Sequence, residues 1–269
     1  MVVQHNMRAM NSNRMLGLTA TAQTKSTEKL SSGYRINRAA DDAAGLSISE
    51  SMRRQIRGLT QASRNAQDGI SFAQSAEGAL TEVQDMLQRM NELLVQAANG
   101  TNSTTQIGYI NDEIDNLNTE IDRIGKDSNF NGQKIFNSTA RKIFVGETES
   151  SEDIEITAHS LTASGVCGSK ISISTNSAAK AALKSVRAGL EKISSWRSEL
   201  GAKQNRLEHT INNLDNLVEN TTAAESRVRD TDMATEMVKY SNANILAQAG
   251  QAMLAQSNQA NQGVLSLLQ

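Results

Sequence analysis

The residues that could do chemistry in this chain are few, and their spacing matches no catalytic or metal-binding pattern. The three histidines, His5, His159 and His209, form no HExxH motif and are not spaced to share a helical face. His209, within RLEHT, is expected on a helix surface or in a helix seam. The sequence also lacks GxxxxGK[ST], GxGxxG, GxSxG and CxxC. We therefore expect no catalytic residue, no cofactor and no metal ion.

Clusters of charged residues could form binding sites, but solvated helix faces explain them better. A metal ion or a carboxylate pair could use an acidic run that lies opposite an isoleucine series, namely Asp112, Glu113, Asp115, Glu120 and Asp122. A charged helix face accounts for this run more simply. A basic patch at Arg53, Arg54 and Arg57 lacks interleaved aromatic residues, and the net charge is only −2. Neither nucleic acid nor a membrane is therefore expected as a partner.

The single cysteine and the distribution of apolar residues further limit the class of protein. Cys167 cannot form a disulfide within the chain, and we expect a small apolar side chain in a loop or strand. No stretch approaches the ~18 apolar residues that a membrane span requires. The opening stretch, MVVQHNMRAMNSNRMLGL, has no apolar core after a basic start, so a cleaved secretory signal is not expected. Taken alone, these features indicate a cytoplasmic protein.

The sequence predicts long helices, which would hold the residues described above. The chain contains no proline, which costs ~3 kcal/mol inside a helix, and only 3% aromatic residues. One seam of apolar residues three, four or seven apart runs through residues 45–98. A second follows a capping box at 103–106 and comprises Ile107, Ile110, Ile114, Leu117, Ile121 and Ile124. A third, from Leu183 to Val218, fits a heptad repeat.

The middle of the chain follows a different pattern. Between about 130 and 175, the segments RKIFVG, DIEITAH and SKISIST alternate or run β-branched, which predicts a small β-hairpin module. The three helical seams must bury one another, since isolated amphipathic helices are marginal in water. The sequence therefore predicts a mainly α fold, a long antiparallel helical bundle or coiled coil formed from both chain ends, with the β module in the middle.

Two domains are expected from this layout. The bundle domain takes residues 45–232, including the β-hairpin region. The terminal helical domain combines residues 1–44 with residues 233–269, where Asp232 is expected to cap the last helix. The two terminal helices are loosely amphipathic and lack a third partner inside the chain, so their apolar residues need burial elsewhere.

Several stretches at the two ends resemble bacterial flagellin. They read KLSSGYRIN, RAADDAAGL, GLTQASRNAQDGIS, QNRLEHTINNL and QAMLAQSNQ. The resemblance covers roughly residues 1–135 and 180–269. It implies a structural subunit of the flagellar filament, exported unfolded through a dedicated channel to the outside of the cell. Because the insert after Gln133 is short, it also implies a short form without large outer domains.

The resemblance also implies particular partners for the terminal helices. Family members polymerise with copies of themselves, bind an export chaperone through the C-terminal helix, and join hook-associated junction and cap proteins. A heterologous contact that does not close into a ring produces a helical filament. We expect a stripe of apolar residues to drive polymerisation and to bind the chaperone: Leu18, Leu246, Met253, Ala260, Val264 and Leu267.

A further implied partner is Toll-like receptor 5. The matching patch in this sequence consists of Gln88, Arg89, Glu92, Leu93, Ile110 and Glu113. The frequent basic or Ile/Val residues of the family around that arginine are here Met90 and Asn91. The same residues could instead serve packing between subunits.

Two alternatives to a filament subunit follow from the same sequence. A hook–filament junction protein shares the terminal architecture but forms a short ring rather than long fibres. Some flagellins also carry a protease insert, but this chain has no HExxH motif and little room for one. We therefore expect a protein that is not an enzyme.

Overall fold

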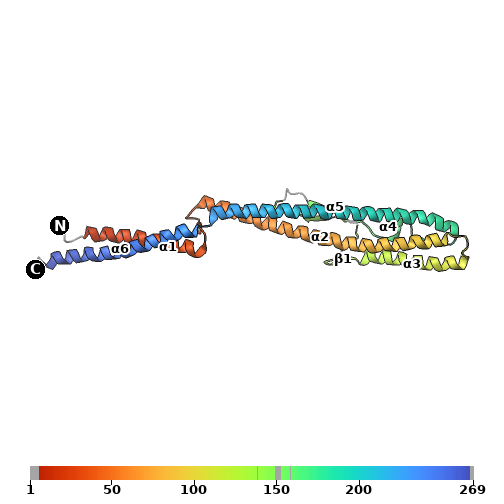
Figure 1. Ribbon diagram of the computed structural model, residues 1–269, viewed down its shortest axis with the longest axis horizontal. Helices are drawn as coiled ribbons and strands as arrows, with labels where there is room; N and C mark the ends of the chain where they lie inside the picture. Colours follow the sequence, from red (N-terminus) through yellow and green to blue (C-terminus); the bar gives the residue numbers. More distant parts are fainter. Residues whose placement is uncertain (1–5, 138, 149–152, 158, 267–269) are drawn as a thin grey trace. The chain divides into compact units, whose positions relative to one another are not determined.

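The computed structural model describes residues 6–137, 139–148, 153–157 and 159–266. His5 and Leu267 lie outside this described part. The fold is mainly α, with two small hairpins in the middle, as the sequence predicted (Figure 1). In chain order the elements are α1 (Met7–Ser32), α2 (Ala43–Ala97), α3 (Thr104–Asp127), β1 (Asn129–Phe130), β2 (Gln133–Lys134), β3 (Arg141–Phe144), β4 (Asp153–Ile156), α4 (Ala163–Cys167), α5 (Asn176–Arg229) and α6 (Met233–Ser266).

The chain forms two compact units. One combines Met1–Ile56 with Asn220–Gln269, and the other is Arg57–Glu219. Helices α2 and α5 each run from one unit into the other. The domain limits expected from the sequence, at 44/45 and 232/233, stay a prediction.

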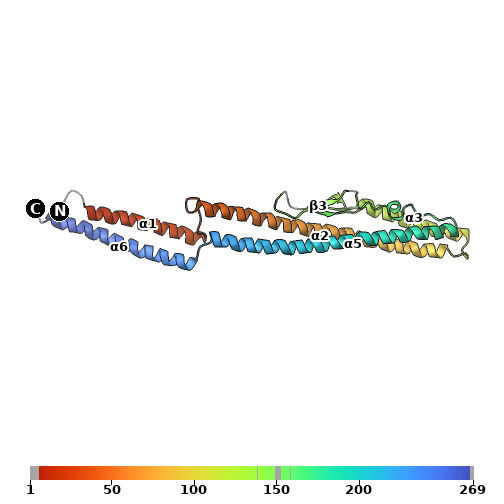
Figure 2. The same cartoon turned by 90° about the horizontal axis from the view of Figure 1, so that it is seen from above.

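Antiparallel pairing of α2 and α5 forms the core of the second unit (Figure 2). Their apolar seams bury one another, with Leu87 and Leu207 fully enclosed. Polar side chains fix the direction of the pairing. Ser63 Oγ donates to Asp215 Oδ1 over 3.1 Å, and Gln204 Nε2 donates to Glu77 Oε2 over 3.2 Å. Residue numbers rise along one helix as they fall along the other, as in the predicted antiparallel bundle.

The predicted capping box begins α3. Gln106 N donates to Ser103 Oγ over 3.3 Å, and Ser103 N donates to Gln106 Oε1 over 2.9 Å. The predicted isoleucine seam is partly shifted, because Leu117 and Ile124 are only half-buried. The fully buried positions beside them are Asn118 and Gly125. Asn118 and Gly125 are buried in place of Leu117 and Ile124 because another segment of the chain lies on α3.

That segment, residues 159–175, corrects one prediction. SKISIST is not a strand, although its alternation is real, since Ile171 and Ile173 are both buried. Its backbone pairs with side chains of α3 instead of with another strand. Asn118 Nδ2 donates to Ile171 O over 2.8 Å, and Ile173 N donates to Asn111 Oδ1 over 2.7 Å. A helix surface with suitable amides can therefore replace a strand as the partner of an alternating segment.

The other two predicted β segments do form a hairpin. Strands β3 and β4 pair antiparallel, with Arg141 opposite Ile156 and Phe144 opposite Asp153. A smaller hairpin joins β1 to β2 through Asn131 and Gly132, which have φ of 50° and 75°. Such positive φ values at two central residues suit an Asn-Gly turn.

The short helix α4 was not expected. It places Cys167 in a helix rather than in a loop or strand, although the side chain is buried as predicted. Burial raises the pKa of the Cys167 thiol to about 11. The thiol is therefore protonated at neutral pH and unreactive.

Candidate functional site

The terminal helices α1 and α6 pack antiparallel through a seam of small and polar residues. On α6 the least exposed positions recur every three or four residues: Glu236, Tyr240, Ala243, Ala247, Gly250, Leu254 and Ser257. The corresponding positions of α1 are Ala9, Ser12, Leu16, Thr19, Gln23 and Ser26. We call these residues the terminal seam. Asn6 Nδ2 donates to Ser257 O over 3.1 Å at one end, and Ser26 Oγ donates to Glu236 Oε1 over 2.7 Å at the other.

The terminal seam holds few large apolar side chains, since its members are mostly Ala, Ser, Thr and Gly. A Cβ added at Gly250 would lie 3.3 Å from Leu16 Cδ1, which shows how closely the helices approach there. Small residues permit that approach but bury little apolar surface, and hydrophobic stabilisation grows with buried area. The pair is therefore weakly held by its own contacts.

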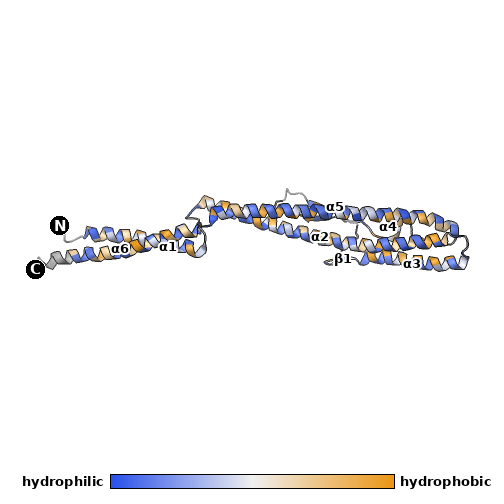
Figure 3. Ribbon diagram, in the orientation of Figure 1, coloured by the Kyte–Doolittle hydropathy of each residue, from blue (hydrophilic) through white to orange (hydrophobic). Residues whose placement is uncertain are grey.

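Most large apolar side chains of α1 and α6, unlike Leu16 and Leu254, lie outside the seam. Ten of the sixteen exposed large hydrophobic residues in the described part of the chain lie on these two helices. We call them the terminal surface: Met7, Met10, Met15, Leu18, Met233, Met237, Val238, Ile245, Leu246 and Met253. Figure 3 shows hydrophobic stretches interrupting the hydrophilic ribbon along both helices. Exposed apolar residues concentrated in one place mark a site of interaction.

The structure places three of the six residues of the predicted stripe on this surface. Leu18, Leu246 and Met253 are 62%, 60% and 59% exposed. Ala260 is also exposed, and Val264 lies within α6, whereas Leu267 is outside the described residues. Residues 246, 253 and 260 are seven apart and lie on one side of α6, away from the seam.

Sequence reasoning missed more than half of the terminal surface. The missed residues are Met7, Met10, Met15, Met233, Met237, Val238 and Ile245. Their positions follow no clean helical period, and polar Asn, Ser and Thr residues separate them. The concentration of methionines at the two ends could have indicated this surface, because methionine is common on adaptable binding surfaces.

One carboxylate is buried in the terminal seam. Glu236 is only 4% exposed and accepts hydrogen bonds from Ser26 Oγ and, at 3.0 Å, from Lys239 Nζ. Burial raises the pKa of this carboxyl, but the two hydrogen bonds and the charges of Lys239 and Lys29 outweigh it, leaving the pKa below its ordinary value of 4.5. The charged form of Glu236 is therefore the one that stabilises the pair.

Acidification should weaken the terminal pair through Glu236. Because the folded pKa is lowered, its contribution is complete above about pH 4.5 and is lost as the pH falls through the folded pKa. The effect should be on the order of 1 kcal/mol. Circular dichroism between pH 6 and 3 should show a smaller loss of helix for Glu236→Gln than for the wild type. Glu219→Gln, at an exposed position, should titrate as the wild type does; identical curves for all three proteins would remove Glu236 from this role.

The connecting segments tie the ends of the terminal helices together within the same unit. Thr231 N donates to Gly33 O over 2.9 Å, and Tyr34 forms a backbone bridge with Asp230. The guanidinium of Arg229 stacks 4.4 Å from the centre of the Tyr34 ring. Asp232 caps α6 as predicted, since Ala234 N donates to its Oδ1 over 3.0 Å. Hydrogen bonds from Thr235 and Ala234 lower the pKa of Asp232, which stays charged at the helix N-terminus.

The predicted receptor patch is only partly accessible. Arg89 Nη2 lies 2.9 Å from Glu113 Oε1, and Arg89 Nη1 lies 3.2 Å from Glu92 Oε2, all on exposed faces of α2 and α3. The hydrogen bond with Glu113, followed by that with Glu92, raises the pKa of Arg89. Gln88 is exposed as well. Leu93 and Ile110, however, are 2% and 8% exposed and belong to the hydrophobic core. They can pack beneath such a patch but are not accessible to a receptor.

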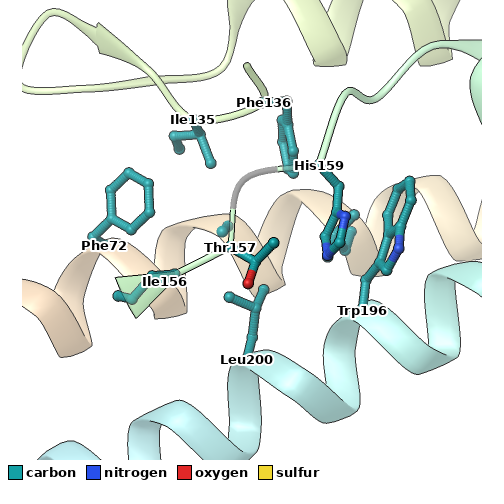
Figure 4. Close-up of a pocket in the computed structure, with 10 residues that line it drawn as sticks. Phe72, Ile135, Phe136, Ile156, Thr157, His159, Trp196 and Leu200 are labelled. Atoms are coloured by element: carbon teal, nitrogen blue, oxygen red, sulfur yellow. The ribbon is translucent and has the colours of Figure 1, made fainter. Parts of the chain in front are cut away.

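One small pocket in the second unit is lined mainly by apolar side chains (Figure 4). The ring of His159 stacks on Trp196 with centroids 4.4 Å apart, and its Nε2 lies 3.3 Å from Glu199 Oε2. Thr157 Oγ1 donates to Glu199 Oε1 over 2.6 Å, and this bond, more than that of His159, lowers the pKa of Glu199. Around them lie Phe72, Ile135, Phe136, Ile156 and Leu200. The group anchors the β module to α5.

Two further findings concern metal binding and membrane spanning. Among the described residues, no three His, Cys, Asp or Glu side chains are grouped closely enough to hold a metal ion. The helices of the described ranges also contain no segment long and apolar enough to cross a membrane. The terminal surface is thus the feature that most needs a functional explanation.

Comparisons with known proteins supply its context. The chain matches the family models of the bacterial flagellin N-terminal helical region, over residues 3–141, and C-terminal helical region, over residues 183–268. A flagellin of Halalkalibacterium halodurans is 50% identical over 271 residues, covering 100% of both chains. The flagellin of Bacillus subtilis is 45% identical over 303 residues, again covering 100% of both chains.

Solved structures agree on the fold. A crystal structure of Bacillus cereus flagellin has a TM-score of 0.50 at 28% identity, covering 56% of this chain and 88% of that chain. A putative flagellar hook-associated protein from Vibrio parahaemolyticus has a TM-score of 0.60, covering 71% of this chain and 100% of that chain. Its identity is only 14%, so this second likeness shows a shared fold alone.

The fold and the paired terminal helices define a helical structural subunit. The chain belongs to the bacterial flagellin family, and it is a structural subunit of a flagellar filament. The alternative of a hook–filament junction protein is not favoured, because flagellins match the chain over its full length.

Proposed function

We propose that the terminal surface is the contact through which copies of this chain polymerise into the filament. One observation carries the proposal: α1 and α6 pair mainly through small and polar residues, while most of their large apolar side chains remain exposed. Neighbouring subunits supply the apolar partners that the chain itself lacks, and the gain from burying the terminal surface drives assembly. A repeated head-to-tail contact of this kind extends into a helical polymer.

Electron microscopy of the purified chain tests this function. After seeding with filament fragments, or after salting out, the chain is expected to form long, uniform helical filaments. Short rings would instead support the junction protein. Monomers alone, under conditions in which a related flagellin polymerises, would contradict a self-assembling subunit.

Export and its partners extend the proposal. We propose that the chain leaves the cell unfolded through the flagellar channel and assembles outside it. A chaperone that covers Met233–Ser266 before export would hide Leu246, Met253 and their neighbours and so prevent early polymerisation. Junction and cap proteins at the ends of the filament would contact the same terminal helices. In this role the protein is structural and carries no catalytic activity.

A second proposed partner is Toll-like receptor 5, which would bind the exposed residues Gln88, Arg89, Glu92 and Glu113. The ion pairs of Arg89 with the two glutamates hold its guanidinium in a fixed orientation between α2 and α3. An oriented arginine is a frequent anchor of protein interfaces.

Replacing Arg89 by Ala should weaken receptor signalling about tenfold, because interface arginines often contribute that much to binding. The measurement is a reporter-cell dose response to purified monomer. Arg123→Ala is the matched control, since Arg123 is equally an exposed arginine paired with carboxylates, those of Glu120 and Asp127. Equal potency of Arg89→Ala and Arg123→Ala would exclude Arg89 from the contact.

A further inference from the structure

Methionine sulfur is unevenly distributed in this protein. Nine of the ten methionines fall within the described residues. Six of these nine are between 47% and 68% exposed, and all six lie on α1 or α6: Met7, Met10, Met15, Met233, Met237 and Met253. The other three belong to α2, where Met52 and Met86 are half-buried and Met90 is fully buried.

The other oxidisable sulfur is protected. Cys167 is the only cysteine and is buried under α5, with Sγ close to Gly189. Its raised pKa keeps the thiol protonated, and oxidants attack the thiolate. Among the described residues, the six exposed thioethers are therefore the sulfur atoms that an oxidant meets first on the folded, unassembled subunit.

We propose that these six methionines form an oxidation-sensitive gate on assembly, in which conversion to methionine sulfoxide blocks polymerisation. This inference rests on the proposed function of the terminal surface. Peroxide is the co-reactant: one oxygen atom passes from H₂O₂ to each thioether sulfur, the O–O bond breaks, a sulfoxide forms and water is released. The sulfur is oxidised by two electrons and the peroxide is reduced by two.

Sulfoxides would block polymerisation because the terminal surface must be buried against apolar neighbours in the filament. Methionine fills an apolar interface well because it is flexible and weakly polar. A sulfoxide oxygen is a strong hydrogen-bond acceptor, and burying it against apolar neighbours without a donor is unfavourable. The six groups are spread over both helices, so sulfoxides would introduce unpaired acceptors into apolar contacts made by either helix. Once the subunit is assembled, burial of the thioethers would protect them, so the gate acts on the free subunit.

The experiment uses the full-length chain as monomer. Hydrogen peroxide is applied and quenched, peptide mass spectrometry locates each sulfoxide, and sedimentation after seeding measures the polymerised fraction. Sulfoxide is expected first at the six terminal positions, with at least a tenfold rise in the concentration needed for assembly. Treatment with a methionine sulfoxide reductase and a dithiol should restore assembly.

Variants distinguish oxidation of the six methionines from oxidative damage elsewhere in the protein. Replacement of all six by leucine (M7L, M10L, M15L, M233L, M237L and M253L) keeps apolar volume but removes the oxidisable sulfur, so assembly should survive peroxide. The control M52L/M86L should remain as sensitive as the wild type.

Three results would overturn the inference: oxidised wild type that assembles normally with sulfoxides present at the six positions, oxidation that falls first on α2, or an assembly defect that reductase does not reverse. Failure of the untreated wild type to polymerise would instead overturn the proposed function, and the inference with it.

Discussion

A chain that ends at residue 245 is expected to stay a folded monomer that forms no filaments. The truncation removes Leu246 and Met253 from the terminal surface, together with the seam contacts of Gly250 and Ser257. The bundle unit of Arg57–Glu219 keeps its own hydrophobic core, so its folding does not depend on the lost helix. Circular dichroism and light scattering should report a helical monomer, and electron microscopy should show no fibres at concentrations where the full chain polymerises. Normal filaments from the truncated chain would contradict the assignment of the terminal surface.

Point variants test the same prediction without removing a helix segment. Leu246→Asp with Met253→Asp should abolish assembly, since both charges would be buried against apolar neighbours in the polymer. Gln248→Asp with Gln251→Asp adds the same two charges at exposed polar positions of α6 and measures the effect of charge alone. A filament yield equally low in both variants would indicate that charge, rather than loss of apolar contact, is responsible.

Replacement of Gly125 by Ala should destabilise the second unit. Gly125 lies in the buried face of α3, and a Cβ there would overlap the backbone carbonyl of Leu161. The clash is with backbone, which cannot rotate away, so the segment on α3 must shift. A loss of about 1–3 kcal/mol in the free energy of unfolding is expected, as for other overpacked core sites.

Gly108 in the same helix provides the control for that measurement. A Cβ at Gly108 meets nothing within 4 Å, so Gly108→Ala should raise stability by up to ~1 kcal/mol through helix propensity. Denaturant unfolding of the two variants should therefore shift in opposite directions. If Gly125→Ala proves as stable as the wild type, residues 159–175 are not held on α3 as the structure has them.

The helices of the bundle were predictable because their pattern is local. A capping box at Ser103 and Gln106 and a strict isoleucine period leave little choice for α3. The same holds for the long seams of α2 and α5, whose large aliphatic residues must be buried together. The Asn131–Gly132 turn also follows from local chemistry.

The segment on α3 could not be predicted by the same reasoning. Alternation at Ile171 and Ile173 indicates burial of one side but does not identify the partner. That partner is a pair of amides, Asn118 and Asn111, which lie 53 and 62 residues away in sequence from Ile171 and Ile173. The glycine that permits the close approach, Gly125, likewise looks like an ordinary interruption of a helix.

The terminal surface is predictable only in part, because its residues are exposed and their spacing follows no clean helical period. Inside one chain, α1 and α6 need only small seam residues, which leave no strong apolar period. Leu246, Met253 and Ala260 of the expected stripe lie on the exposed side of α6, where contact with other subunits is possible. The inward heptad of Glu236, Ala243, Gly250 and Ser257 is too small and polar to be recognised.

The bundle unit is stabilised by its own core, whereas α1 and α6 in the other unit pair mainly through small and polar residues and bury few large apolar side chains. A weakly held pair opens locally at low cost in free energy, and contact with neighbouring subunits would suppress that opening. We therefore propose that folding of the ends and growth of the filament are one process.

Hydrogen–deuterium exchange, compared between monomer and assembled filament, tests this claim most directly. In the monomer, amides of Met7–Ser32 and Met233–Ser266 should exchange rapidly, while those of the paired α2 and α5 within Arg57–Glu219 are protected. In the filament, the account predicts a large gain of protection concentrated in the two terminal helices. Terminal amides already protected in the monomer, and unchanged on assembly, would contradict it.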